Sequence, residues 1–357
     1  MNKSTLQALV LITIALMTAS CAGKGGRVTQ LDAAGATFPL PYYTEAFKAY
    51  EELSGIHVNY GAVGSGGGIR SLKDEVVDFA ASDAFLSDEE LAEMPREVIH
   101  IPTCMGAVVI AYNCPEITSL QLTGEIIANI YLGKITRWND PAIAAINPDQ
   151  KLPDKEISPV YRSDGSGTTN VFSDYLTKVS PDWAAQIGTG KSLKWPTGMA
   201  AKGNPGVAGV IAQTDGALGY VGSEYSFSLD IPTAKVQNQA GNFVLPSLES
   251  ISAAAAGEVA PDTRQMITNS AHPEAYPISC LTWLITYKDL SYSNHSEAEA
   301  TETARLLNWM LSDKAQAITS QIHFAPLSPE MLAVAKAQLA QLTYGGNPID
   351  LTSSPNE

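Results

Sequence analysis

The chain has 357 residues, 45% of them hydrophobic, which is enough to bury sizeable cores and, by the usual size of domains, favours two lobes over one. Its 22 basic and 37 acidic residues give a formal net charge of −15. Nucleic acid is not expected as a partner, because no basic patch with interleaved aromatic residues could neutralise a phosphate backbone.

The first twenty residues have the features of a secretion signal peptide. Lys3 supplies a short positive region, the apolar stretch 6–17 is too short to cross a bilayer, and Thr18-Ala19-Ser20-Cys21 forms a small-residue cleavage site. The pattern resembles a bacterial lipoprotein signal, which implies cleavage after residue 20, a lipid on Cys21 and a tether over residues 21–26. Cleavage without a lipid stays open, because threonine stands three positions before the cysteine, where leucine is usual.

Prolines and a glycine mark the limits of the first predicted helix. The segment Gly35-Ala36-Thr37-Phe38-Pro39-Leu40-Pro41 places prolines where a helix should begin, and Ser54-Gly55 is a glycine stop. The apolar residues that recur at helical spacing between them are Tyr43, Phe47, Tyr50 and Leu53. Unpaired N–H groups at the start of such a helix suit an anion.

A glycine-rich segment, Gly64-Ser65-Gly66-Gly67-Gly68, lies between a strand-like run at 56–63 and a short helix predicted over 69–76. A strand, a glycine loop and a helix in this order can cradle an anion. A flexible linker is the alternative meaning of a Gly/Ser run. The strand and helix rhythm continues into residues 77–83, however, which favours the cradle.

Short apolar runs alternate with helical patterns from Val58 to about Tyr220. This alternation predicts α/β lobes with mostly parallel sheets flanked by helices. The apolar run 105–112 predicts a buried strand, because it is far shorter than the eighteen or so residues of a membrane span.

The segment Arg162-Ser163-Asp164-Gly165-Ser166-Gly167-Thr168-Thr169 combines a guanidinium, small hydroxyl groups and unhindered N–H groups at one predicted helix start. Ser166 is expected to cap this helix, since apolar residues recur at 3.6-residue spacing directly after it, at Val171, Phe172, Tyr175, Leu176 and Val179. Alone, the segment could be an ordinary capped helix with a surface arginine. Together with the two earlier segments it indicates a site for a tetrahedral anion.

In order and spacing, the three segments resemble the high-affinity phosphate-binding proteins of bacterial phosphate ABC transporters, and the resemblance covers nearly the whole chain after the leader. The sequence departs from that family at Gly66, Phe85 and Asn170. Other segments that carry the resemblance are 81–84, 130–140, 188–190, 194–196, 216–221 and 276–278.

This resemblance implies the two-lobe fold of type II periplasmic binding proteins, with the ligand cleft between lobes joined by crossover strands near residues 102–104 and 277–279. The first lobe would comprise residues 27–103 and 279–357, and the second lobe residues 104–278. An amphipathic C-terminal helix containing Met331 and Leu339 would pack on the first lobe.

Position by position, the resemblance also implies the phosphate ligands. The first lobe would supply N–H and hydroxyl groups and one carboxylate, and the second lobe a guanidinium, a hydroxyl and N–H groups. Asp164 would hold the guanidinium in place. The implied ligands are Thr37, Phe38, Ser65 and Asp83 in the first lobe and Arg162, Ser166 (hydroxyl and N–H), Gly167 and Thr168 in the second.

Asp83 is the one acceptor in this set. Phosphate near neutral pH carries at least one proton that a carboxylate can accept, whereas sulfate carries none, so this residue type would select phosphate. The alternative is that Asp83 only caps the loop after its strand or the following Ser87.

Enzyme motifs are missing from the sequence. There is no Gly-x-Ser-x-Gly elbow, no His-Glu-x-x-His and no phosphate-binding loop of the Gly-x-x-x-x-Gly-Lys-Ser/Thr type, and the five histidines form no ligand-spaced pair. We expect no catalytic residue, metal or cofactor. The resemblance implies a monomeric, extracytoplasmic, lipid-anchored receptor that passes inorganic phosphate to the permease subunits of an ABC importer. A sulfate or molybdate receptor, an extracytoplasmic phosphate sensor and a cleft-bound phosphatase are the alternatives.

Besides Cys21 the chain has three cysteines, in a compartment that would be oxidising. Cys104 and Cys114 are too far apart to bond along one extended segment. Because Cys104 and Cys280 both lie at the crossovers that the resemblance implies, we expect a disulfide between them, with three buried free thiols as the alternative.

Overall fold

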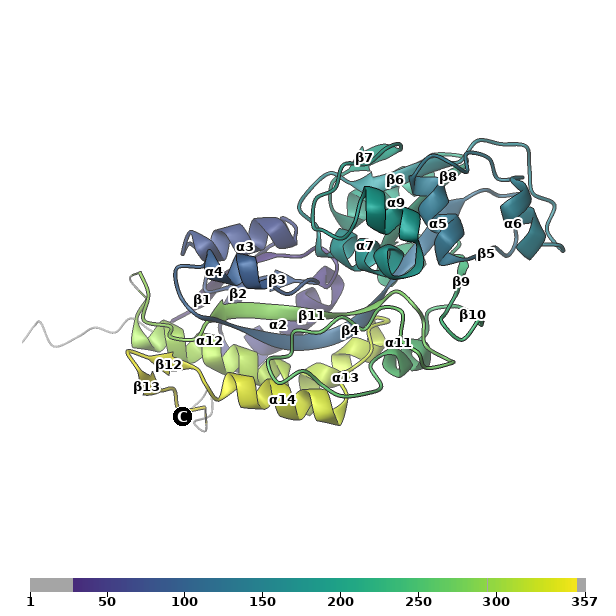
Figure 1. Cartoon of the computed structure of the whole chain (residues 1–357). Coiled ribbons are helices and arrows are strands. Elements are labelled where there is room, and N and C mark those ends of the chain that lie inside the picture. The colour runs from purple at the N-terminus through teal and green to yellow at the C-terminus, as the bar shows by residue number, and fades with distance from the viewer. Residues whose placement is uncertain (1–27, 294, 352–357) are drawn as a thin grey trace, which may run out of the picture.

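A computed structural model describes residues 28–293 and 295–351 (Figure 1). The predicted signal peptide, Cys21 and the tether to residue 26 lie outside the described residues. Within the described ranges, no helix has both the length and the apolar character needed to cross a membrane.

An eight-stranded sheet in the order β2-β1-β3-β11-β4-β8-β6-β7 runs through the molecule. Four pairings are parallel (β1 with β2 and β3, β6 with β7 and β8), and the three that involve β11 or β4 are antiparallel. The prediction of mostly parallel α/β structure is therefore confirmed. The strands are β1 (Gln30–Gly35), β2 (His57–Gly61), β3 (Phe79–Ser82), β4 (Val98–Asn113), β6 (Ser158–Arg162), β7 (Met199–Ala201), β8 (Ala217–Gly222) and β11 (Ser279–Tyr287).

Helices cover both halves of this sheet (Figure 1). The larger ones are α2 (Leu40–Ser54), α3 (Ser65–Lys73), α5 (Gly124–Tyr131), α7 (Gly167–Val179), α9 (Gly203–Gln213), α12 (Glu297–Met310), α13 (Asp313–Gln321) and α14 (Pro329–Leu339). The shorter ones are α4 (Asp88–Ala92), α6 (Pro141–Ile146), α8 (Pro181–Gln186), α10 (Ser223–Ser228) and α11 (Leu248–Ala254). Small ladders are formed by β5 (Gln121–Leu122), β9 (Lys235–Gln237) and β10 (Phe243–Val244), and by β12 (Thr343–Tyr344) and β13 (Asn347–Pro348).

Strand β4 joins the two halves. It pairs with β11 from Val98 to Ala107 and with β8 from Val108 to Asn113, and all but its last residue are buried. Figure 1 shows α2, α3, α12, α13 and α14 around the half that contains β1 to β3 and β11, and α5, α7 and α9 around the half that contains β6 to β8. We call these halves the first and second lobes. Strand β4 changes its pairing partner at Val108, four residues after residue 104, where the sequence predicts the second lobe to begin.

The predicted limits of two helices are confirmed. Helix α2 begins at Leu40 with Pro41 in its first turn and ends at Ser54. The next residue, Gly55, caps it with a φ of 75°, the left-handed conformation that glycine adopts without strain. Ser166 caps α7, because its hydroxyl accepts a hydrogen bond from the Thr169 N–H at 3.0 Å.

The glycine-rich segment is helical, contrary to the loop predicted there. Helix α3 begins at Ser65 rather than Ile69 and ends at Lys73, so that three glycines form its first turn. A β-carbon on Gly68 would clash with the Ala34 carbonyl oxygen and lie 2.5 Å from Gly35 Cα. The close packing of α3 on β1 explains why glycine is needed at Gly68. The start of helix α3 therefore stands where the sequence predicts a glycine loop that cradles an anion.

The predicted disulfide is wrong. Cys104 and Cys280 are both buried free thiols, as is Cys114. In the antiparallel register Cys104 lies opposite Thr282 and Cys280 opposite Gly106, so the two cysteines are diagonal neighbours. Diagonal neighbours in such a ladder are about 7–8 Å apart, beyond the usual reach of a disulfide.

Candidate anion-binding site

Strand ends and helix starts from both lobes meet where the sequence predicts a site. Thr37 and Phe38 follow β1, Asp83 follows β3, Ser65 begins α3, and Arg162 ends β6 shortly before α7. In open α/β sheets, ligands bind at this carboxyl end of the strands. The structure thus brings the residues of the implied ligand set together from segments far apart in the sequence.

The two lobes approach each other closely at this point. The Gly66 N–H in the first lobe donates to the Gly165 carbonyl in the second at 2.9 Å. A β-carbon on Gly167 would lie only 2.5 Å from Ser65 Oγ and 2.8 Å from Asp83 Oδ2. Only glycine therefore allows the start of α7 to reach the start of α3. In the first turns of these helices, Gly66 and Thr169 already use their N–H groups within the protein, whereas those of Ser65 and Gly167 make no hydrogen bond among the described residues and are available to an anion.

Arg162 is buried, and its guanidinium is held in a fixed orientation. Its Nε donates to Asp164 Oδ1 at 2.8 Å, its Nη2 pairs with Asp164 Oδ2, and its Nη1 donates to Thr168 Oγ1 at 3.3 Å. A guanidinium has five N–H donors, so two remain for a ligand. Burial alone would raise the pKa of Asp164, but the hydrogen bonds and charge of Arg162 outweigh it and hold that pKa below its usual value.

The aromatic core of the second lobe supports this arginine. The Tyr220 hydroxyl accepts the backbone N–H of Arg162 at 3.0 Å and is hydrogen-bonded to Thr169 Oγ1 at 2.7 Å. Its ring stacks on Phe172 with centroids 4.3 Å apart. One buried side chain thus fixes the end of β6 relative to the start of α7.

Asp83 is a buried carboxylate among donors. Its Oδ2 accepts a hydrogen bond from Thr168 Oγ1 at 3.0 Å, whereas Oδ1 has no hydrogen-bond partner among the described residues. Burial raises the pKa of Asp83 to about 7, although Thr168 and Arg162 act in the opposite direction. Above that pH, Oδ1 is an open acceptor.

Ser166 differs in one respect from the implied ligand set. Its N–H donates to the Lys191 carbonyl at 2.9 Å and is therefore engaged within the protein. Its hydroxyl accepts from Thr169 as the helix cap, which leaves the hydroxyl proton free to be donated. The contribution expected from Ser166 is thus reduced to its hydroxyl.

Sequence reasoning missed two residues that contact Thr37 from the second lobe. The Tyr225 hydroxyl donates to the Thr37 carbonyl, and Asn204 donates to Thr37 Oγ1 from both its backbone N–H and its side chain, each at 3.0 Å. The dipeptide Asn204-Pro205 is typical of a helix start with proline at the first position. Helix α9 instead begins at Gly203, with Pro205 as its third residue.

Sequence reasoning also missed Glu224, which lies beside Gly222 in the second lobe. It is 3% exposed, and neither of its carboxylate oxygens nor the neighbouring Ser223 hydroxyl has a hydrogen-bond partner within residues 28–293 and 295–351. Burial raises the pKa of Glu224 well above its usual value, and the charge of Asp83 adds to this increase. Glu224 is therefore expected to be neutral in the folded protein.

We expect Glu224→Gln to raise the melting temperature by several degrees at pH 8 and to have little effect near pH 4.5. The pKa of Glu224 is higher in the folded than in the unfolded protein, so at pH values between the two only the folded parent carries this proton. The free energy of unfolding of the parent therefore falls as pH rises through this window. The variant lacks this titration. Thermal unfolding from pH 4.5 to 8 at saturating phosphate tests this, with the exposed Glu249→Gln as control. A variant no more stable than the parent at pH 8 would contradict it.

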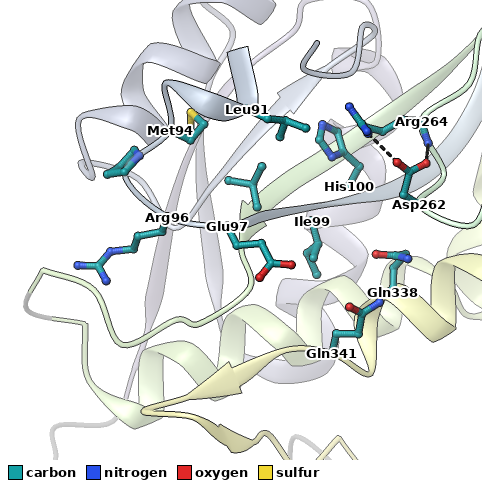
Figure 2. Close-up of a pocket in the computed structure, with 12 residues that line it drawn as sticks. Leu91, Met94, Arg96, Glu97, Ile99, His100, Asp262, Arg264, Gln338 and Gln341 are labelled. Atoms are coloured by element: carbon teal, nitrogen blue, oxygen red, sulfur yellow. Dashed lines mark hydrogen bonds and ion pairs between the residues drawn. The ribbon is translucent and has the colours of Figure 1, made fainter. Parts of the chain in front are cut away.

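A separate pocket of about 580 Å³ lies away from these residues (Figure 2). His100 on its wall accepts the Leu86 N–H through Nε2 at 3.2 Å, and burial lowers the pKa of His100 to about 3, so this ring is neutral. Arg264 is already paired with Asp262 at 2.8 Å, as Figure 2 shows, and with Asp88 at 2.9 Å. The charge of Arg264 in this pocket is thus balanced by two carboxylates.

Comparisons with known proteins give a consistent result. The family model described as PBP superfamily domain matches residues 21–314. The chain is 37% identical over 346 residues to the "Phosphate-binding protein PstS" of Pasteurella multocida, covering 94% of this chain and 95% of that protein. It is 37% identical over 317 residues to PstS of Haemophilus influenzae (87% and 93%) and 31% identical over 337 residues to PstS of Methanocaldococcus jannaschii (85% and 86%).

Solved structures show the same fold. A high-affinity periplasmic phosphate-binding protein (PfluDING) with bound phosphate superposes with a TM-score of 0.69 at 23% identity, covering 90% of this chain and 97% of that one. A phosphate ABC transporter substrate-binding protein from Clostridium perfringens gives 0.61 at 17% identity, covering 84% and 100%. The predicted two-lobe class is thereby confirmed. The chain belongs to the PBP superfamily and, within it, to the family of the phosphate-binding protein PstS.

Proposed function

We propose that this protein is a receptor that binds one inorganic phosphate between its lobes and delivers it to an ABC-type phosphate importer. The observation that carries this proposal is a buried cluster of hydrogen-bond donors that surrounds one open acceptor, Asp83 Oδ1. The relatives are named as phosphate-binding proteins, and their family is one of solute-binding receptors, not enzymes.

In this proposal the anion is held by local groups and not by net charge. A formal charge of −15 opposes an anion at long range, but screening at physiological salt limits that effect to about 8 Å. Preoriented dipoles in a dehydrated site act at short range, where they count for more. The proposed donors are the two remaining Arg162 N–H groups, the hydroxyls of Thr37, Ser65 and Ser166, and the N–H groups of Thr37, Phe38, Ser65, Gly167 and Thr168.

The open acceptor gives the proposed site its selectivity. Phosphate can donate a proton to Asp83 Oδ1, whereas sulfate would place an unprotonated oxygen against a carboxylate. A site built around a required donor can reject an analogue that lacks it by about 10⁴ to 10⁵. Sulfate and molybdate receptors would have no use for this carboxylate.

Binding is proposed to close two lobes formed by residues 27–103 with 279–357 and by residues 104–278. Support comes from contacts that run between the two lobes. Besides the hydrogen bond between Gly66 and Gly165, Lys191 Nζ in the second lobe pairs with Glu90 in the first, at 2.8 Å from Oε1 and 2.6 Å from Oε2. This ion pair is largely shielded on the lysine side and would have to break when the lobes open.

We further propose that the chain works outside the cytoplasmic membrane as a monomer anchored by lipid at Cys21, after removal of residues 1–20. The sequence pattern from Lys3 to Cys21 supports this. The intact mass of the mature protein would distinguish a lipid-bearing Cys21 from a simply cleaved terminus.

Calorimetric titration with phosphate, sulfate and arsenate tests the binding proposal, after bound ligand has been removed by partial unfolding. We expect one phosphate per chain, no measurable sulfate binding at the same concentrations, and a higher melting temperature with phosphate by mass action. Phosphate should also make the particle more compact in small-angle scattering. Absence of phosphate heat would contradict the function, and identical scattering profiles would contradict closure alone.

A further inference from the structure

Asn204 is fully buried and lies between the lobes, as the second residue of α9. Its Nδ2 donates to Thr37 Oγ1 at 3.0 Å and to Thr168 Oγ1 at 3.1 Å. Its Oδ1 accepts the Gly222 N–H at 2.9 Å. Because a backbone N–H can only donate, the atom that faces Gly222 must be the oxygen, which fixes the orientation of the amide.

This orientation decides the direction of the Thr37 hydroxyl. A hydroxyl can accept two hydrogen bonds and donate one. Both acceptor positions of Thr37 Oγ1 are filled, by the backbone N–H and by Nδ2 of Asn204. No hydrogen bond among the described residues uses the Thr37 proton, so it is left for an anion in the site.

The same amide decides the direction of the Thr168 hydroxyl. Thr168 Oγ1 accepts from Asn204 Nδ2 and from Arg162 Nη1, and it therefore donates its proton to Asp83 Oδ2. That bond occupies Oδ2 and leaves Oδ1 as the open acceptor of the carboxylate. One amide thus sets the polarity of hydroxyls that come from both lobes.

We propose that Asn204 is a positioning residue for anion recognition. It makes Thr37 an obligate donor to the bound anion, and it keeps Thr168 a donor to Asp83 so that a single carboxylate oxygen is open to the ligand. The inference rests on the proposed phosphate function and adds to it a residue that acts through two hydroxyls without itself contacting the ligand.

A double-mutant cycle tests this proposal. Asn204→Ala should weaken phosphate binding at least tenfold in the parent, because Thr37 can then direct its proton away from the anion. A Thr37→Val background has no hydroxyl at position 37 to orient. There, Asn204→Ala should weaken phosphate binding by a factor at least five times smaller than in the parent. If Asn204 had a merely structural role, Asn204→Ala would weaken phosphate binding by the same factor in both backgrounds.

Asn113→Ala is the matched control. Its amide donates to Ile211 O at 3.0 Å and Ala212 O at 3.1 Å, at the other end of α9, so it supports the same helix without contacting Thr37 or Thr168. We expect phosphate affinity within twofold of the parent. If Asn204→Ala does not fold, Asn204→Leu takes its place in the cycle, because it keeps the approximate volume of the side chain, adds no charge and loses the donor. Equal losses of phosphate affinity in the parent and Thr37→Val backgrounds would overturn this inference alone. A parent protein that binds no phosphate would overturn the proposed function as well.

Discussion

Replacing Arg162 with methionine is expected to weaken phosphate binding at least about 100-fold. The guanidinium has two N–H groups left for the anion once Asp164 and Thr168 are satisfied. Hydrogen bonds to charged groups contribute about 1.5–3 kcal/mol each, and 1.4 kcal/mol is a tenfold change in affinity. Since these bonds are made to charged oxygens that arsenate also presents, arsenate affinity should fall with phosphate affinity. Isothermal titration of parent and variant measures both losses.

The loss of binding must be separated from a loss of stability. Arg162→Met leaves Asp164 largely buried without its cation, which is costly. We expect the added change Asp164→Asn to restore most of the melting temperature and none of the phosphate affinity. Arg162→Lys should give an intermediate loss, because it keeps a charge without the planar fork. Arg137→Met removes an exposed arginine paired with Asp154 and should change nothing. A double variant that regains affinity along with stability would contradict a direct role for Arg162.

Local sequence signals were sufficient where a single segment determines the structure. Pro41 and Gly55 marked the limits of α2, and Ser166 marked the start of α7, because capping is decided by residues within one turn. The start of α3 was misplaced for the opposite reason. Three glycines are poor helix formers, and only the contact of Gly68 with the backbone of β1 shows why a helix begins there.

The parts of the site that were missed depend on contacts between distant segments. Asn204 bonds to Thr37, 167 residues earlier, and nothing in the residues around either one signals that contact. Glu224 gives no sign in the sequence that it is buried. Register also matters, because the separation of Cys104 from Cys280 depends on which residues of β4 and β11 face each other. The chemical character of the site could be read from the sequence, but its internal hydrogen bonding could not.

Replacing Asp83 with asparagine should change selectivity more than affinity. Asparagine keeps the shape of the side chain, and its carbonyl can still accept the phosphate proton, so phosphate binding should weaken less than about tenfold. Its amide can now donate to an unprotonated oxygen. Discrimination against sulfate should therefore fall by more than tenfold, which corresponds to about 1.4 kcal/mol. Competition titrations of phosphate and sulfate at fixed pH and salt measure the ratio.

The pH dependence of this ratio identifies the carboxylate as its source. Burial raises the pKa of Asp83 to about 7, so below that pH the parent carboxyl is increasingly protonated and becomes a donor. Phosphate itself titrates near neutral pH with both proteins, but the carboxyl titrates only in the parent. Discrimination should therefore shrink more between pH 8 and pH 6 in the parent than in Asp83→Asn. Asp78→Asn, at the other end of β3, is the matched control, because Asp78 is buried and pairs with His295 away from the site. An Asp83→Asn protein that rejects sulfate as strongly as the parent at pH 8 would show that selectivity arises elsewhere.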